Sequence, residues 1–419
     1  MKRSIRFLSL LLCVLLSLPT FGCAKAEEID LTVAQSNAGT LYIQIPEDAT
    51  AQTLYARDRL VFFVQEKLGV TLDSGSEPNG ECVLVLGNVG DEVCTKLAKK
   101  LKGLGEYAVR ASGDRITVLA DNEAFLYDAV EYLIEKMSVT ASEIRLQGTV
   151  DCISAGNTAS LRYMFTQSTV LESTSTRFGT LPFHPEDIRG TQGGCRVGNY
   201  HYQTYIKNDK ESNELNNICY IGKYDLTTQT VVQYSERLDL NHANDVTYNS
   251  RTNELVVVHN KPRYTQLSII DPDTLTLKRT VDLPGPVYAV TYNATRDEYA
   301  VGRSNSQNIH RVTNDFKFVT KDPYTATPTT KTYTTQGICS DDTFIYCVLY
   351  DGLHAKTSAM QNVITVYDWY GNYVGTINFE NERLEPENIS VVDGTLHVLS
   401  HSTTCGVFHD IVPCLPAAD

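Results

Sequence analysis

The feature that most constrains this chain is an internal repeat in its C-terminal half. The run TQGGC at residues 191–195 returns as TQGIC at 335–339, and DVTYN at 245–249 returns as AVTYN at 289–293. With a last copy near the C-terminus, the spacings are 52, 44, 48 and 51 residues between the anchors Gly194, Val246, Val290, Ile338 and Ile389. Propeller blades repeat about every 40 to 50 residues. The repeat therefore predicts a five-bladed all-β propeller over residues 160–414.

The copies also contain the remaining strands of a blade. Residues 266–275 and 364–372 each predict a third and a fourth strand joined by a tight turn. The last copy reaches the end of the chain before a fourth strand. We expect residues 161–165, LRYMF, to supply that strand from before the first blade, because this closes the ring and leaves no exposed edge.

Residues 28–150 predict a separate small α/β domain, which makes the whole chain α+β. The chain has 419 residues, 42% of them hydrophobic, and is long enough for two cores. Strand and helix patterns alternate along the segment. We expect strands at 41–45 and 82–87, a hairpin over 107–119, and helices at 51–68 (ended by Gly69), at 91–101 and after the capping residue Asn122.

Short motifs in this domain are shared with a known family. They are IQIP at 43–46, LGV at 68–70, VLVLGN at 83–88 and GEY at 105–107. In these motifs, residues 41–137 resemble the small α/β domain that precedes the catalytic barrel in bacterial β-hexosaminidases and α-glucuronidases. The barrel carries the chemistry in those enzymes, and no barrel pattern follows here. The resemblance implies association with carbohydrate rather than its cleavage.

The N-terminal residues predict an export signal over residues 1–22. Three basic residues precede an apolar stretch at 7–18 that is too short to span a bilayer comfortably. Cys23 follows in a pattern similar to a bacterial lipobox, so we expect lipidation of Cys23 and a membrane anchor at the cell surface. The small residues around 24–26 leave ordinary secretion as the alternative.

Charge and motif content limit the partners of the chain. The 36 basic and 50 acidic residues give a net charge of −14 without a basic cluster, so nucleic acid is not an expected partner. No phosphate loop, dinucleotide fingerprint or metal-ligand spacing appears, so neither a cofactor nor a metal is expected. Disulfides Cys339–Cys347 or Cys405–Cys414 are an alternative to free thiols, but Cys195, Cys339 and Cys347 lie in apolar strand patterns, where cysteine acts as a small hydrophobe.

Polar residues just before the inner strands are the candidate ligand-binding residues. Innermost strands line the central channel of a propeller, so the residues that precede them gather at one mouth. The candidates are Gln192, Asn244, Asp245, Tyr288, Gln336, Glu387, Asn388 and His242. Gly193 and Gly337 are expected to leave room for a ligand, and loops 207–217 and 351–361 to wall the mouth. The alternative is that these polar groups only cap turns or bond to the next blade.

Three functions fit this pattern. The first is a non-catalytic surface lipoprotein that binds a glycan or cell-wall polymer in the propeller mouth. The repeat region resembles five-bladed propellers of bacterial surface proteins, lectins and some glycosidases. The second function is therefore a glycosidase or lyase, with Asp245 and Glu387 as the catalytic carboxylates. The third is a scaffold that binds another surface protein through the propeller rim.

Overall fold

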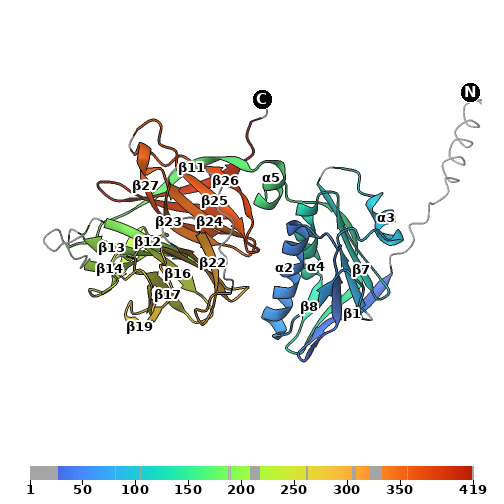
Figure 1. Cartoon of the computed structure of the whole chain (residues 1–419). Helices are drawn as coiled ribbons and strands as arrows, with labels where there is room; N and C mark the ends of the chain where they lie inside the picture. Colours follow the sequence, from blue (N-terminus) through green and yellow to red (C-terminus); the bar gives the residue numbers. More distant parts are fainter. Residues whose placement is uncertain are drawn as a thin grey trace, which may run out of the picture. The chain divides into compact units, whose positions relative to one another are not determined.

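The computed structural model divides the chain into two compact units between Asn157 and Thr158. Figure 1 shows both, and each is described by itself. No helix in the described part is long and apolar enough to cross a membrane. The predicted export segment and Cys23 lie outside that part. The structure describes residues 27–80, 82–103, 105–186, 188, 190–207, 218–260, 263–303, 308–319, 333–355 and 357–417.

A six-stranded mixed sheet forms the centre of the first unit. Its strands, in spatial order, are β10 (Asp151–Ala155), β6 (Glu106–Ser112), β7 (Arg115–Ala120), β5 (Cys82–Leu86), β3 (Leu41–Gln44) and β4 (Ser74–Gly75). Neighbouring strands from β7 to β4 are parallel, and β6 pairs antiparallel with both β7 and β10. Strand β10 was not predicted. It extends the sheet to Ala155, beyond the predicted end of the domain at residue 150.

Helices cover both faces of this sheet. Helix α2 (Ala51–Leu68) begins after Thr50, whose side chain accepts from the Thr53 N–H, and ends at Gly69, which has φ 71°. Helix α4 (Leu126–Glu135) contacts α2 and strands β6 and β7. Helix α3 (Glu92–Ala98) packs Cys94 and Leu97 against the other face (Figure 1). Because helices cover both faces of the sheet, the apolar strand residues at 82–87 lie between helices on both sides.

A second sheet in this unit was not predicted. It is antiparallel, and its spatial order is β2 (Ala38–Gly39), β1 (Glu28–Gln35), β9 (Glu143–Thr149) and β8 (Met137–Val139). In β1 the buried side chains Ile29, Leu31 and Val33 alternate with more exposed ones. That period of two is present in the sequence and is the signal that would have identified the strand.

The second unit consists of antiparallel sheets that follow one another along the chain. The first sheet contains β12 (Gly190–Val197), β13 (Tyr200–Lys207), β14 (Ile218–Asp225) and β15 (Thr230–Tyr234). The second sheet contains β16 (Asp245–Asn249), β17 (Glu254–Val258), β18 (Gln266–Ile270) and β19 (Leu277–Asp282). The third sheet, within the described residues, contains β20 (Ala289–Asn293), β21 (Glu298–Arg303) and β22 (Asn308–Thr313). Then follow β23 (Thr334–Ser340), β24 (Phe344–Tyr350), β25 (Val363–Asp368) and β26 (Tyr373–Asn378), and last β27 (Glu385–Val392), β28 (Thr395–His401) and β29 (Gly406–Cys414).

The first strands of these sheets form a closed ring. Strand β12 neighbours β16, β16 neighbours β20, β20 neighbours β23, β23 neighbours β27, and β27 returns to β12. The anchor positions of the sequence repeat all lie on these inner strands: Gly194, Val246, Val290, Ile338 and Ile389. Sheets arranged around a ring of inner strands are the architecture of a β-propeller, so the second unit is propeller-like.

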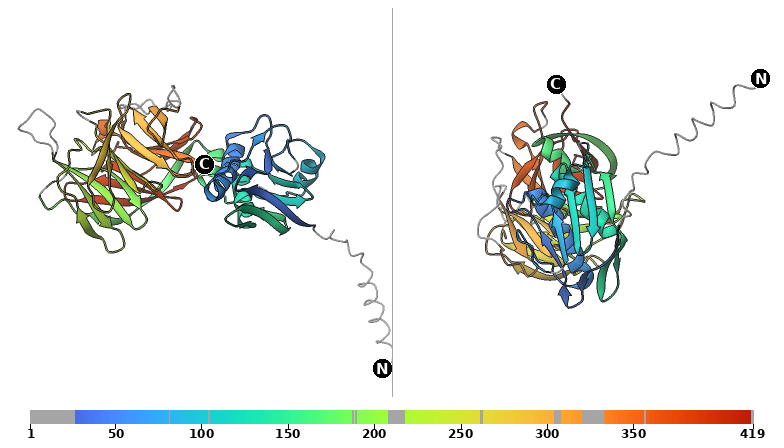
Figure 2. Two further views of the ribbon diagram at one scale, coloured as in Figure 1. Left: turned by 90° about the horizontal axis from the view of Figure 1, so that it is seen from below. Right: turned by 90° about the vertical axis from the view of Figure 1, so that its right-hand side faces the viewer.

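The expected closing strand was placed wrongly. Residues 161–165 lie in helix α5 (Leu161–Gln167), whose first turn is capped by the Ser160 side chain. The closing strand is β11 (Val170–Leu181), which pairs antiparallel with β29 and extends the last sheet. Figures 1 and 2 show the green β11 ribbon beside the red C-terminal strands. A serine cap overrode the strand propensity of LRYMF, while the Ser- and Thr-rich alternation of β11 suits a half-exposed strand.

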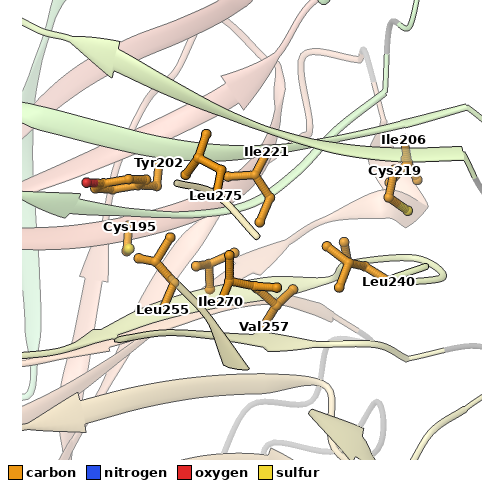
Figure 3. Close-up of a cluster of buried hydrophobic side chains, with 12 residues drawn as sticks. Cys195, Tyr202, Ile206, Cys219, Ile221, Leu240, Leu255, Val257, Ile270 and Leu275 are labelled. Carbon is orange, nitrogen blue, oxygen red and sulfur yellow. The ribbon is translucent and has the colours of Figure 1, made fainter. Parts of the chain in front are cut away.

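Apolar contacts between neighbouring sheets form the core of the propeller-like unit. Figure 3 shows such a cluster between the first and second sheets, where Cys195 and Tyr202 meet Leu255 and Leu275. Cys195 is 9% exposed and packs as a small hydrophobe, as its apolar strand pattern predicts. The cysteines of the described residues are free thiols, including Cys339 and Cys347.

Candidate binding site at the propeller mouth

A polar recess of about 270 Å³ lies at the entry ends of the inner strands. Six of the predicted ligand-binding residues line it: Gln192, His242, Asn244, Tyr288, Gln336 and Glu387. The other lining residues were not predicted; they are Asn260, Thr334, Thr335 and Glu385. Six of the eight candidate residues from the repeat therefore lie together in the structure.

Three of the inner strands, β12, β23 and β27, have a β-bulge at the recess. The strand register shifts between Thr191 and Gly194 in β12, between Thr335 and Gly337 in β23, and between Pro386 and Asn388 in β27. The extra residues include Gln192, Gln336 and Glu387, all of which line the recess. A β-bulge changes the direction of a side chain at a strand end. No such shift occurs in the pairing of β16 or β20.

Asp245 does not line the recess, contrary to the prediction. Its carboxylate is 1% exposed and accepts the backbone N–H groups of Val246 (2.9 Å), Val290 (2.9 Å) and Ile338 (3.2 Å). These donors belong to β16, β20 and β23. Burial raises the pKa of Asp245, while the three N–H donors oppose that rise. With its oxygens occupied by the backbone, Asp245 joins inner strands and is not available to a substrate.

Asn388 and the two glycines also serve packing, contrary to the prediction. The Asn388 amide is 1% exposed and donates to Gln192 O (3.2 Å) and Gln203 Oε1 (3.1 Å). A Cβ on Gly193 would lie 2.2 Å from Asp245 Cα, and one on Gly337 would lie 3.1 Å from Asn388 Cα. The glycines therefore allow inner strands to approach one another and do not make room for a ligand.

Two carboxylates, Glu385 and Glu387, lie in the wall of the recess. Gln336 Nε2 donates to Glu385 Oε1 (2.6 Å), and Gln192 Nε2 donates to Glu387 Oε2 (3.3 Å). Glu387 is 5% exposed, and burial, followed by the nearby charge of Glu385, raises its pKa. Glu385 was detectable in the sequence, since it precedes Glu387 by two residues in the same strand.

A chain of amide hydrogen bonds crosses the recess wall. Asn244 Nδ2 donates to Tyr288 O (2.7 Å), so Asn244 Oδ1 is the acceptor for Asn260 Nδ2 (3.0 Å). This order fixes the orientation of both amides. It leaves the buried Asn260 Oδ1 without a hydrogen-bond partner, and the buried Thr335 Oγ1 also has none. Both side chains are 5% exposed and line the recess.

His242 lines the recess, whereas the nearby His259 is buried in the protein interior. The backbone N–H of His242 donates to the backbone carbonyl oxygen of His259 (3.0 Å). His259 is fully buried, with Nδ1 2.7 Å from Asn241 Nδ2 and Nε2 2.6 Å from Ser268 Oγ. Burial lowers the pKa of His259 to about 4. Asn241 therefore donates to a neutral imidazole, which in turn donates to Ser268.

The expected wall loops lie elsewhere or outside the described residues. Residues 358–361 of the loop 351–361 line a separate polar cleft of about 700 Å³ together with Glu172, Asn378 and Glu382. The loop 207–217 lies outside the described residues except for Lys207. Over the described ranges, no cluster of three or more His, Cys, Asp or Glu side chains is arranged to hold a metal ion.

Comparison with known proteins gives similarities of fold only. No family model and no curated protein matches the chain. Among solved structures, glutaminyl cyclase from Myxococcus xanthus is 12% identical, with a TM-score of 0.39, over 58% of this chain and 99% of that one. A DUF4221 family member from Bacteroides vulgatus is 8% identical, with a TM-score of 0.37, over 59% and 99%. The β-propeller domain of Cps50 (Swd1) from Myceliophteria thermophila is 9% identical, with a TM-score of 0.31, over 56% and 98%. Similarity at this level carries no information about activity.

Proposed function

We propose that this protein is a non-catalytic binding protein whose second unit is a five-bladed propeller that holds a glycan or cell-wall polymer at its mouth. The observation that carries the proposal is the recess, with its buried, unpartnered Asn260 Oδ1 and Thr335 Oγ1. Native proteins rarely leave such atoms unsatisfied, and a ligand rich in hydroxyl groups would satisfy both. The expected export signal and lipid anchor on Cys23 fit a surface location, where such polymers occur.

A glycan array followed by isothermal titration calorimetry on the purified protein tests the proposal. We expect saccharide binding that weakens about 3- to 10-fold in Gln336→Ala, because that variant removes one hydrogen-bonding group from the recess. Gln233→Ala is the matched control, since Gln233 lies on the outer strand β15 and not at the recess. Absence of saccharide binding, or equal affinities in both variants, would contradict the proposal.

A glycosidase is the second candidate, and one observation favours it. Glu385 and Glu387 both line the recess, and the raised pKa of Glu387 is the property that a general acid requires. The pair differs from the one expected from sequence, because Asp245 is occupied by the backbone. Incubation with the polysaccharides that bind, followed by product analysis, separates the candidates. Product release that is lost in Glu387→Gln would make the protein an enzyme.

A further inference from the structure

One buried acceptor in the recess wall, Asn260 Oδ1, has no hydrogen-bond partner. The amide donors of Gln192 and Gln336 are directed at Glu387 and Glu385. The Nδ2 groups of Asn244 and Asn260 are used within the wall, which leaves Asn260 Oδ1 open. A ligand group that satisfies Asn260 Oδ1 must therefore be a donor, whereas the unpartnered Thr335 hydroxyl can accept or donate.

The charge of the recess has one sign. Its described lining contains two glutamates and neither lysine nor arginine. Glu387 is 5% exposed, so a positive charge placed beside it is only weakly screened by water. The aromatic ring of Tyr288 also lines the recess, and such rings attract cations. Each of these features favours a cationic donor over a neutral one.

The size of the recess indicates an organic group and not a bare ion. Its volume of about 270 Å³ is slightly below the roughly 300 to 1,000 Å³ of sites for drug-sized ligands. Over the described residues, no group of three or more His, Cys, Asp or Glu side chains is arranged for a metal ion. One sugar ring with its substituents is of suitable size.

We infer that the recess binds a saccharide through a protonated amino group, as in glucosamine-containing chains whose amines are not acetylated. The ammonium group lies between Glu385 and Glu387, where its three N–H donors meet the carboxylates and Asn260 Oδ1. The ring hydroxyl groups bind to the remaining acceptors, among them Thr335 Oγ1. This inference rests on the proposed function and specifies its ligand class.

Calorimetry with three matched oligosaccharides tests the inference. They are a glucosamine oligomer, the N-acetylglucosamine oligomer of equal length, and a neutral glucose oligomer. We expect the glucosamine oligomer to bind at least about tenfold more tightly than the other two, as is typical for a charge-assisted hydrogen bond. Glu387→Gln and Glu385→Gln should each remove most of this preference. Glu236→Gln, an exposed carboxylate away from the recess, should preserve it.

Proton release supplies a second readout. An ammonium group bound beside Glu387 lowers the pKa of that carboxyl from its raised value, so binding releases a proton to the buffer at any pH where the carboxyl is protonated in the free protein. Titrations in two buffers with different ionisation enthalpies measure the release. The other titratable groups near Glu387 are Glu385, His242, Tyr288 and Tyr350. Burial raises the pKa of both tyrosines above the usual range, so neither releases a proton in acidic or neutral buffer, and His242→Gln separates the histidine from Glu387.

The outcomes distinguish this inference from the proposed function. Equal affinity for the three oligomers without proton release overturns the amine preference and leaves glycan binding intact. Loss of binding on addition of EDTA also overturns it, since a metal ion would then occupy the recess. Failure of every saccharide to bind overturns both. Circular dichroism shows whether each variant is still folded. Glu385→Gln changes a half-buried residue, so it is less disruptive to folding than Glu387→Gln and provides a second test of the carboxylates.

Discussion

Asp245 accepts three backbone N–H groups from β16, β20 and β23 with one side chain. A buried carboxylate is costly unless such donors surround it. Here the donors belong to different sheets, so the side chain that satisfies them also holds inner strands together. The residue type that suggested catalysis in the sequence thus has a structural explanation.

Asp245→Asn should lower the free energy of unfolding. An amide directs an NH₂ group toward at least one backbone N–H that the carboxylate now satisfies, and leaving a buried donor without an acceptor costs about 1 to 3 kcal/mol. Urea denaturation followed by circular dichroism measures the change. The exposed Asp282→Asn is the control and should be nearly neutral. Unchanged stability in Asp245→Asn would show that its carboxylate does not hold the strands.

His259 should make stability dependent on pH in the mildly acidic range. Burial lowers its pKa to about 4, below the value of about 6.5 of the unfolded chain. The unfolded chain therefore binds more protons, and the contribution of His259 to stability, complete above pH 6.5, is lost as pH falls toward 4. The slope is at most about 1.4 kcal/mol per pH unit for this site.

Urea denaturation of wild type and His259→Gln between pH 7.5 and 4.5 isolates this contribution. The stability advantage of wild type should shrink as pH falls, because only wild type takes up this proton on unfolding. His354→Gln, at a partly exposed histidine, serves as the comparison. A constant difference between wild type and His259→Gln would refute the assignment.

At the scale of elements, β11 closes the last sheet. It joins the beginning of the second unit to β29 at its end, pairing Glu172 with Cys414 and Leu181 with Gly406. Its first residues also pair in parallel with β26 of the preceding sheet. One strand therefore covers the open edge of the final sheet and ties it to its neighbour, which removes an edge that would otherwise be exposed.

Adjacent proline substitutions in β11 test this closure. In an antiparallel pair, alternate residues donate to the partner strand, so either Thr174 or Ser175 directs its N–H toward β29. Of Thr174→Pro and Ser175→Pro, one should cost about 3 kcal/mol or more and the other markedly less. Thermal unfolding measures both. If neither variant is destabilised, β11 does not form the closing strand.

At the scale of the whole molecule, each unit has its own sheets and core. The last strand of the first unit is β10, which ends at Ala155, and the ring of inner strands lies in the second unit. All described residues that line the recess at the propeller mouth belong to the second unit.

Residues 158–419 produced alone should fold and retain saccharide affinity within about twofold. The reason is that every described lining residue of the recess belongs to this unit, as do the neighbours in the ring of β12, β16, β20, β23 and β27. Calorimetry on this fragment and on the full chain gives the comparison. An insoluble fragment, or one with at least tenfold weaker binding, would show that the first unit is required.

The inner strands, and the meeting of six candidate residues at one recess, could be predicted from the sequence. Strand periodicity and the repeat are local properties, and the anchors Gly194, Val246, Val290, Ile338 and Ile389 lie on inner strands as aligned. Equivalent positions of the repeats meet at one end of the ring. Aligning the repeats was therefore enough to predict that Gln192, Gln336 and Glu387 lie close together. The helix over residues 51–68 was likewise predicted from its own apolar spacing and its terminal glycine.

Which polar side chains line the recess could not be predicted from the sequence, because it depends on how neighbouring strands pair. The register shifts beside Gln192, Gln336 and Glu387 direct these residues differently from Asp245, and a bulge arises from pairing with another strand. The closing strand depended on the same kind of information, since β11 pairs with residues more than two hundred positions away. Local patterns specify which segments form strands, but the direction of each side chain depends on the strand beside it.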